Sequence, residues 1–341
     1  MTEIKDWLRI VGAAHASGAE IWTEGEVTAR RVGGGGNNAL YHVKLDGQQY
    51  ACKLCVDDGR CRAAREHGAL SLLEAAGIDI APQPLLLDES CAVLPFPTVV
   101  YRWLSGEALG PLITLEQLAA LLSSIQQAHT LRQDDHEQAG LSDAWFHWFD
   151  MNPYLDELDE LLVQYGGWLV HHEPDGADLR ERMVCLVDRC KRALSSSTAE
   201  VGRGRFPLRL CRVDPNLSNA IWSREGTLRW VDWEYSGWGD PALDLADLRW
   251  HVALEGVSEA QHARLRNDYL RPAGDPGFEE RLAAWDRLLL TRWPLLVLRL
   301  LWSAYNGPDR LRLTQLDASP TALHARLLRT VERAERFTNG Q

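Results

Sequence analysis

Residues 211–221 read CRVDPNLSNAI, and residues 231–234 read VDWE. Asp, Pro and Asn are typical turn residues, so a turn is the simplest interpretation of the first stretch. However, apolar runs flank it at residues 208–211 and 220–222, and the chain then turns at Glu225-Gly226 and returns to Asp232. The polar residues therefore lie at the ends of short strands, where the fold can hold them in a fixed arrangement.

Counting across the turn brings two oxygen ligands together. If Glu225-Gly226 is a two-residue hairpin turn, Asn219 lies opposite Asp232. Directly opposed residues of an antiparallel pair lie about 5 Å apart. Because Mg²⁺ takes one or two protein oxygens and completes its shell with phosphates and water, the pair predicts a magnesium site. Asp214, in the loop before this pair, can accept the proton of a hydroxyl that attacks a phosphoryl group.

A glycine-rich loop lies upstream, between two predicted strands. It contains Gly33, Gly34, Gly35 and Gly36, which leave backbone amides free to approach a phosphate because no side chain obstructs them. A flexible hairpin loop would explain these glycines equally well. The residues that follow them decide between the two interpretations.

Lys53 lies in an apolar strand pattern, where an ammonium must find a partner or lose its charge. Glu66, in the next helix, shares a face with Leu70 and Leu73 and therefore points to the same interior. Each residue alone fits a solvated surface charge. Together, after a glycine-rich hairpin, they form the arrangement with which kinases hold nucleotide phosphates.

The rest of the sequence predicts an α+β fold of two lobes. Asp46-Gly47 is a strong hairpin signal between two of the strand patterns. We expect residues 1–104 to form a nucleotide-binding lobe with an N-terminal helix, a small antiparallel sheet and one further helix. Helix patterns dominate residues 105–341, which we expect to form the larger lobe with the catalytic loop and the substrate cleft. The expected helices are residues 2–17 and 60–76. The expected strands are residues 26–32, 39–45, 48–56, 84–88 and 98–103.

These motifs resemble the signature of the aminoglycoside phosphotransferase and choline kinase group, small-molecule kinases with a protein-kinase-like fold. The resemblance covers about residues 26–250 and implies ATP, with GTP left open, and Mg²⁺ as cofactors. The signature, H-x-D-x4-N followed by I-D-[FW]-E, stands here as Arg212, Asp214, Asn219, Val231, Asp232, Trp233 and Glu234.

The resemblance also implies site residues. Asp214 would be the catalytic base, Asn219 and Asp232 would bind Mg²⁺, and Glu234 would contact the substrate. The nucleotide would lie against the glycine loop, Lys53, Glu66, Val100, Tyr101 and Trp103.

Two residues depart from the group's pattern. Arg212 stands where the group has His, and Val213 stands where it has a small residue. The His chiefly organises the loop, so we expect Arg212 to take that role, and the change affects loop geometry more than proton transfer. A nucleotide-binding pseudokinase that acts through a partner is therefore one alternative.

An acidic block bears on the substrate. Residues 134–181 hold thirteen Asp or Glu and one Arg, a net charge of −12, which leaves the rest of the chain near neutral. Such a field concentrates cations and predicts a small aminated substrate, aminoglycoside-like or choline-like. Trp145 and Trp148 lie beside Asp150 in this block and could hold an ammonium. A helix with a buried aromatic face explains them as well, and a kinase of a neutral sugar or metabolite alcohol is the second alternative.

The bulk composition excludes several other partners. With a net charge of −12 and a pI near 5.4, the chain has no broad nucleic-acid footprint. Charged residues are spread through the first ten residues, which lack the apolar core of a signal peptide. The late apolar run at residues 293–302 is too short to span a bilayer. Seven cysteines without a compact framework predict reduced thiols in the cytoplasm. The oligomeric state stays open.

Overall fold

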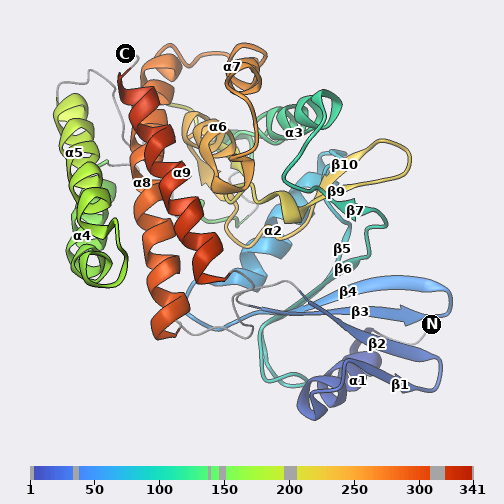
Figure 1. Cartoon of the computed structure of the whole chain (residues 1–341). Helices are drawn as coiled ribbons and strands as arrows, with labels where there is room; N and C mark the ends of the chain where they lie inside the picture. The colour runs from blue at the N-terminus through green and yellow to red at the C-terminus, as the bar shows by residue number, and fades with distance from the viewer. Residues whose placement is uncertain are drawn as a thin grey trace.

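The computed structural model describes residues 4–33, 38–136, 140–145, 151–195, 206–307 and 319–339. Its N-terminal part is a six-stranded sheet in the order β1-β2-β3-β4-β6-β5, with every neighbouring pair antiparallel (Figure 1). The strands are β1 (Ile21–Glu24), β2 (Val27–Val32), β3 (Ala39–Leu45), β4 (Gln48–Leu54), β5 (Pro84–Asp88) and β6 (Thr98–Arg102).

The two faces of this sheet contact different partners. One face packs on α1 (Ile4–Ser17) through residues such as Tyr41, Cys52 and Val100. The other face carries Ala51 and Tyr101 and joins the main core together with α2 (Arg62–Ala75). Because side chains alternate along a strand, Lys53 of β4 lies on the face of Ala51, toward α2 and the helical part.

The hairpin between β3 and β4 confirms the turn expected at Asp46-Gly47. Leu45 pairs with Gln48, so the loop has two residues. Both loop residues have positive φ, 50° at Asp46 and 72° at Gly47, as a type I′ turn requires. This turn fixes the register that places Lys53 opposite Leu40.

The C-terminal part is mainly helical, which confirms the predicted α+β class. Helix α8 is its central element and packs against α4, α5, α6 and α9 (Figure 1). In the described ranges, no helix combines the length and the apolar character needed to cross a membrane. The helices are α3 (Leu115–Ala128), α4 (Asn152–His172), α5 (Gly176–Ser195), α6 (Pro241–Trp250), α7 (Glu259–Asn267), α8 (Phe278–Asn306) and α9 (Pro320–Asn339).

Five short strands interrupt the helices and carry the polar motifs. β7 (Glu107–Ala108), β9 (Ala220–Trp222) and β10 (Leu228–Trp230) form one small sheet. β8 (Arg209–Cys211) and β11 (Gly237–Gly239) form another. The sequence pattern did not predict β1, β7 or β11, which are short. The boundary at residue 104 stays a prediction.

The register of the β9–β10 hairpin corrects the count made from the sequence. Trp222 pairs with Leu228 and Ala220 pairs with Trp230, so Asn219 lies opposite Val231 and not opposite Asp232. The loop has one more residue than expected: the N–H of Ser223 donates to the carbonyl of Thr227 at 2.9 Å. Gly226, at φ 76°, supplies the left-handed residue of this three-residue loop.

Candidate active site

Three carboxylates surround the ammonium of Lys53. Its Nζ lies 2.7 Å from Glu66 Oε2 and 3.1 Å from Glu234 Oε2, and it also contacts Asp232 Oδ1. Burial alone would lower the pKa of Lys53, but Asp232, Glu234 and Glu66 raise it well above its usual value. Conversely, burial raises the pKa of Glu66 and of Glu234. The cluster has more carboxylate than cation, so a divalent ion fits its chemistry.

Glu234 joins the sheet-bearing part to the helical part. Asn38 Nδ2 and Arg62 Nη1 donate to its two oxygens, in addition to its ion pair with Lys53. Asn38, directly after the glycine-rich loop, also accepts the N–H of Val56 at 3.0 Å. The structure therefore places Glu234 in the Lys53 cluster, and its contact with the substrate stays a prediction.

The predicted catalytic loop, which carries Asp214, lies across α6, whose carboxylates accept three successive backbone amides. Asp244 accepts the N–H of Arg212 at 3.0 Å and that of Val213 at 2.8 Å, and Asp247 accepts that of Asp214 at 3.2 Å. Val213 and Asp214 both have left-handed φ, 58° and 56°. For residues other than Gly, such a backbone costs on the order of 1–3 kcal/mol each, and these hydrogen bonds help to hold it.

Arg212 is fully buried beneath the same loop. Its Nη1 donates to the carbonyls of Val213, at 2.8 Å, and Asp214, and its Nη2 donates to that of Val231 at 2.9 Å. The guanidinium thus links the catalytic loop to the segment that carries Asp232. This geometry supports the predicted role of Arg212 as a loop organiser.

Asp214 and Asp247 face one cavity from adjacent segments, and their pKa values shift in opposite directions. Asp214 Oδ1 lies 3.3 Å from His251 Nε2. Burial favours protonated Asp214, but the hydrogen bond from His251, together with the charge of Arg212, outweighs burial and lowers the pKa of Asp214. Burial raises the pKa of Asp247 to about 6, and the charge of Asp214 adds to this effect. Two carboxylates in one cavity with separated pKa values are typical of acid–base chemistry.

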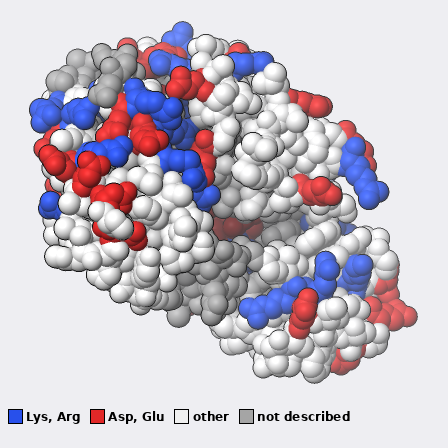
Figure 2. Space-filling view, viewed as in Figure 1, with Lys and Arg blue, Asp and Glu red and all other residues white. Residues whose placement is uncertain are grey.

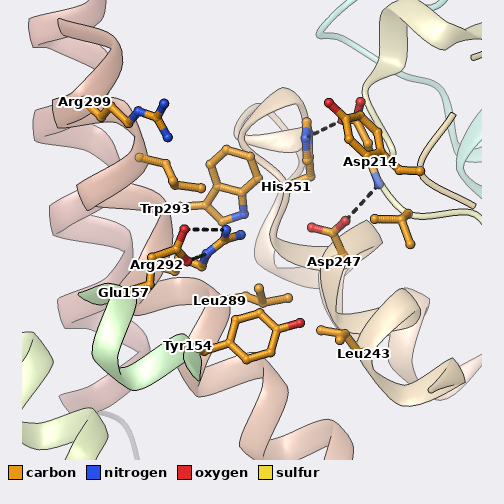
Figure 3. Close-up of a pocket in the computed structure, with 13 residues that line it drawn as sticks. Tyr154, Glu157, Asp214, Leu243, Asp247, His251, Leu289, Arg292, Trp293 and Arg299 are labelled. Atoms are coloured by element: carbon orange, nitrogen blue, oxygen red, sulfur yellow. Dashed lines mark hydrogen bonds and ion pairs between the residues drawn. The ribbon is translucent and has the colours of Figure 1, made fainter. Parts of the chain in front are cut away.

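The cavity in front of Asp214 has a volume of about 260 Å³. In Figure 3 the two carboxylates and His251 lie on one side, and the α8 residues Arg292, Trp293 and Arg299 lie on the other. The lining residues are Tyr154, Glu157, Val213, Asp214, Tyr235, Leu243, Asp247, His251, Leu289, Arg292, Trp293, Leu296 and Arg299.

The acidic block contributes little charge to this cavity. Among its described residues only Tyr154 and Glu157 line the cavity, and Glu157 is paired with Arg292 at 2.6 Å. On the outer helices, Asp159 contacts Lys191 and Asp178 lies 3.4 Å from Arg182. Figure 2 shows both signs interspersed over that region. Basic side chains of the protein therefore neutralise part of the negative charge of the block, and little of that charge faces the cavity.

The predicted aromatic cage is described only at Trp145. The guanidinium carbons of Arg60 and Arg65 lie 5.4 Å and 5.9 Å from the centre of its ring. Protein cations thus lie beside this indole, where the sequence analysis expected a substrate ammonium. Trp148 and Asp150 lie outside the described residues.

The predicted magnesium ligands lie at adjacent strand ends. The N–H of Val231 donates to the carbonyl of Asn219 at 2.9 Å, and Asp232 follows with a left-handed φ of 63°. Asp232 lies two residues after the end of β10, and its side chain contacts Lys53. The structure therefore places the backbone of Asn219 beside Val231, the residue before Asp232, although the register differs from the expected one.

The predicted nucleotide residues have different surroundings. Tyr101 shares the sheet face of Lys53, whereas the Val100 side chain lies on the opposite face, in the cluster with α1. Trp103 stacks on His42, with ring centres 4.1 Å apart. Of the four glycines only Gly33 is described; Gly34, Gly35 and Gly36 lie outside the described residues. In Figure 2 the surface is hollowed between the two parts.

Two site residues escaped the sequence analysis, Asp247 and His251. Asp240, Asp244, Asp247 and His251 recur at helical spacing along α6 and into its C-cap. That spacing places polar groups on one face of an otherwise buried helix, which is a signal for a polar partner. Nothing in the sequence itself says that the partner is the catalytic loop.

The sequence profile of the phosphotransferase enzyme family matches residues 28–288. The solved choline kinase LicA of Streptococcus pneumoniae is 19% identical, with a TM-score of 0.55 over 98% of this chain and 99% of that chain. A choline/ethanolamine kinase family protein from Mesorhizobium loti is 19% identical, with a TM-score of 0.58 over 97% and 93%. A spectinomycin phosphotransferase, solved with ADP and spectinomycin, is 14% identical, with a TM-score of 0.60 over 92% and 94%. No curated protein matches. These likenesses confirm the two-lobed, kinase-like α+β fold.

Proposed function

Because the chain belongs to the phosphotransferase enzyme family, whose profile matches residues 28–288, we propose that it transfers the γ-phosphate of ATP to a hydroxyl group of a small molecule. The observation that carries this proposal is the position of Asp214. Its carboxylate lines the cavity, and the loop that holds it is joined through Arg212 to the segment of Asp232. A hydroxyl in the cavity would thus meet a base beside a phosphate-binding cluster.

Each group of the cluster has a part in the proposed reaction. Lys53 would bind the nucleotide phosphates, and Glu66 would orient its ammonium. Asn219 and Asp232 would hold Mg²⁺, which when bound neutralises charge that develops on the transferred phosphoryl group. Asp214 would accept the hydroxyl proton as the new oxygen–phosphorus bond forms. Positioning and electrostatics would supply most of the rate.

For the acceptor, the proposal is a small cationic alcohol. Asp247 presents a second carboxylate next to Asp214, and Tyr154 and Trp293 add aromatic surface to the same cavity. A hydroxyl at Asp214 would bring a neighbouring ammonium to Asp247. A volume of about 260 Å³ lies at the small end of ligand pockets, which hold roughly 300–1,000 Å³, and favours a choline-sized alcohol over a whole aminoglycoside.

A neutral sugar or metabolite alcohol is the second candidate acceptor. The observation that favours it is the α8 wall, where Arg292 and Arg299 place guanidinium groups opposite the two carboxylates. Guanidiniums repel an ammonium and donate hydrogen bonds to hydroxyl oxygens. A pseudokinase is the less favoured reading, since Lys53, Asp214, Asn219 and Asp232 are all in place.

A panel of acceptors tests the proposal. Purified protein with Mg-ATP is given choline, ethanolamine, thiamine, aminoglycosides and neutral sugars, and ADP release is measured with wild type and with Asp214→Asn. We expect at least one cationic alcohol to stimulate release by wild type only. If the acceptor is cationic, Asp247→Asn should raise its KM about tenfold or more and leave the KM for ATP unchanged. An acceptor-independent result, or equal turnover by Asp214→Asn, would remove the proposal.

A further inference from the structure

His251 is a buried imidazole whose two ring nitrogens have different partners. It is 6% exposed and caps the C-terminus of α6, where the short 3-10 turn Val252–Leu254 begins. Its Nδ1 accepts the N–H of Ala253 at 3.1 Å, and its Nε2 lies 3.3 Å from Asp214 Oδ1. The ring also stands edge-on to the Trp293 indole, with centres 4.6 Å apart at 80°.

These contacts define the tautomer. A ring nitrogen that accepts a backbone N–H carries no proton, so the ring proton of the neutral imidazole is on Nε2. The Nε2–H therefore donates to Asp214 Oδ1, as the dashed line in Figure 3 marks. Both nitrogens are thereby fixed, one by the backbone of the following turn and the other by the carboxylate.

We infer that His251 is a positioning residue for Asp214, an inference that rests on the proposed phosphotransfer. By holding Oδ1, the imidazole directs Oδ2 of the base into the cavity, where the acceptor hydroxyl would lie. Nothing in the signature of the resembling group includes this residue. It comes from the far end of α6, the helix that also accepts the three amides of the catalytic loop.

The same geometry argues against a proton relay. His251 Nε2 already carries a proton and Nδ1 is occupied by Ala253, so the imidazole has no open lone pair toward Asp214. In the proposed step the hydroxyl O–H bond breaks and the acceptor oxygen bonds to the γ-phosphorus of ATP. The bond from that phosphorus to the β–γ bridging oxygen breaks and ADP leaves, while the proton stays on Asp214 until it passes to solvent. His251 thus stabilises the ionised base before the step and takes no proton from it.

The charged groups around this pair come from several segments. Asp247 lies one turn before His251 on α6, and Arg212 lies under the catalytic loop. Arg292 reaches the cavity from α8 and is paired with Glu157 of α4. These groups are the same in any His251 variant, so a change in the pH profile of such a variant reports the lost hydrogen bond.

Two substitutions separate the two contacts of the ring. The Asn side chain reaches as far as Nδ1, so His251→Asn keeps an acceptor for Ala253 and loses the contact with Asp214. The Gln side chain reaches as far as Nε2, so His251→Gln keeps an N–H for Asp214 and loses the acceptor for Ala253. Each variant is therefore the control for the other, and thermal unfolding shows whether both fold.

The kinetic arm compares kcat, KM and the acid limb of the kcat/KM profile. We expect His251→Asn to lower kcat about tenfold, to leave the acceptor KM within about twofold, and to move the acid limb up by about one pH unit. The kcat of His251→Gln should stay within about threefold of that of wild type, and the acid limb of its profile should lie at the wild-type pH. A folded His251→Asn with the wild-type profile, or a folded His251→Gln as impaired as His251→Asn, would overturn the inference.

The second arm needs no turnover. In ¹⁵N-histidine spectra, with the His251 signals assigned by their loss in His251→Gln, the inference requires Nε2 protonated and Nδ1 unprotonated at pH 7.5. A protonated Nδ1 would overturn it. If the acceptor panel gives no turnover but this tautomer is found, the proposed function fails while the contact with Asp214 stands.

Discussion

Arg212 lies over the ring of Trp230, with its guanidinium carbon 4.1 Å from the centre of the indole. From there it donates to carbonyls of the catalytic loop and of the Asp232 segment. Burial lowers the pKa of Arg212, while Asp214 and Asp232 favour its charged form. Where the resembling group has a His, this chain therefore has a larger cation that joins two loops and is stacked on a neighbour.

Removal of this guanidinium should cost both stability and turnover. Arg212→Ala leaves several buried carbonyls without a donor, so we expect the free energy of unfolding to fall by about 2–4 kcal/mol and kcat to fall at least tenfold. Urea unfolding and ADP release measure the two effects. Arg212→Lys is the matched control, because one ammonium keeps the charge but cannot bridge both loops. Equal stability of Arg212→Ala and wild type would refute the organising role.

Asp232 should control metal-dependent nucleotide binding. We expect Asp232→Asn to weaken Mg-ATP binding at least tenfold, because a carboxylate ligand is lost, and to change binding of ATP in EDTA by less than about twofold. Calorimetric titrations with and without Mg²⁺ measure the difference. The control is Asp79→Asn, an exposed carboxylate paired with Arg229. Equal weakening with and without the metal would show that Asp232 acts on Lys53 alone.

Asp247 should make the free protein less stable as the pH rises. Its pKa is about 6 in the folded chain and about 3.9 in the unfolded chain, so the folded state holds the proton more tightly between these values. The contribution of this proton to stability is fully present below pH 4 and is lost as the pH rises through 6. We expect the free energy of unfolding of Asp247→Asn to exceed that of wild type by about 1–3 kcal/mol at pH 8 and to differ little from it at pH 4.

Urea unfolding at both pH values checks this prediction for Asp247. Asp159→Asn, a change in an exposed carboxylate that contacts Lys191 on the outer helices, is the control. If Asp247→Asn raised the free energy of unfolding equally at pH 4 and pH 8, packing and not the charge of Asp247 would cause the effect. A lower stability at pH 8 would contradict the raised pKa.

Local patterns predicted the parts of the site that depend on short-range geometry. The Asp46-Gly47 turn and strand alternation sufficed to place Lys53 on the α2 face, where helical spacing also placed Glu66. The β9–β10 register was wrong by one residue, because Gly226 can end either a two-residue or a three-residue loop. Loop length is decided by side-chain hydrogen bonds such as Ser223 to Thr227, which no pattern shows.

Contacts between distant segments could not be predicted. Glu234 meets Asn38 and Arg62, which precede it by 196 and 172 residues. His251 meets Asp214 only because α6 passes beneath the catalytic loop. The cationic substrate stays a prediction, but the acidic block on which it was based is partly neutralised in the fold. Helix packing sets Lys191, Arg182 and Arg292 against carboxylates of the block, which its charge in sequence does not show.

The most direct test of the central claim is the ³¹P spectrum of a reaction with Mg-ATP and the best acceptor of the panel. Wild type should convert the γ-phosphate signal into ADP and a phosphomonoester of the acceptor. Asp214→Asn should bind Mg-ATP with similar affinity and form that ester at least a hundredfold more slowly. Ester formation by Asp214→Asn at the wild-type rate, or release of inorganic phosphate alone by wild type, would contradict the account.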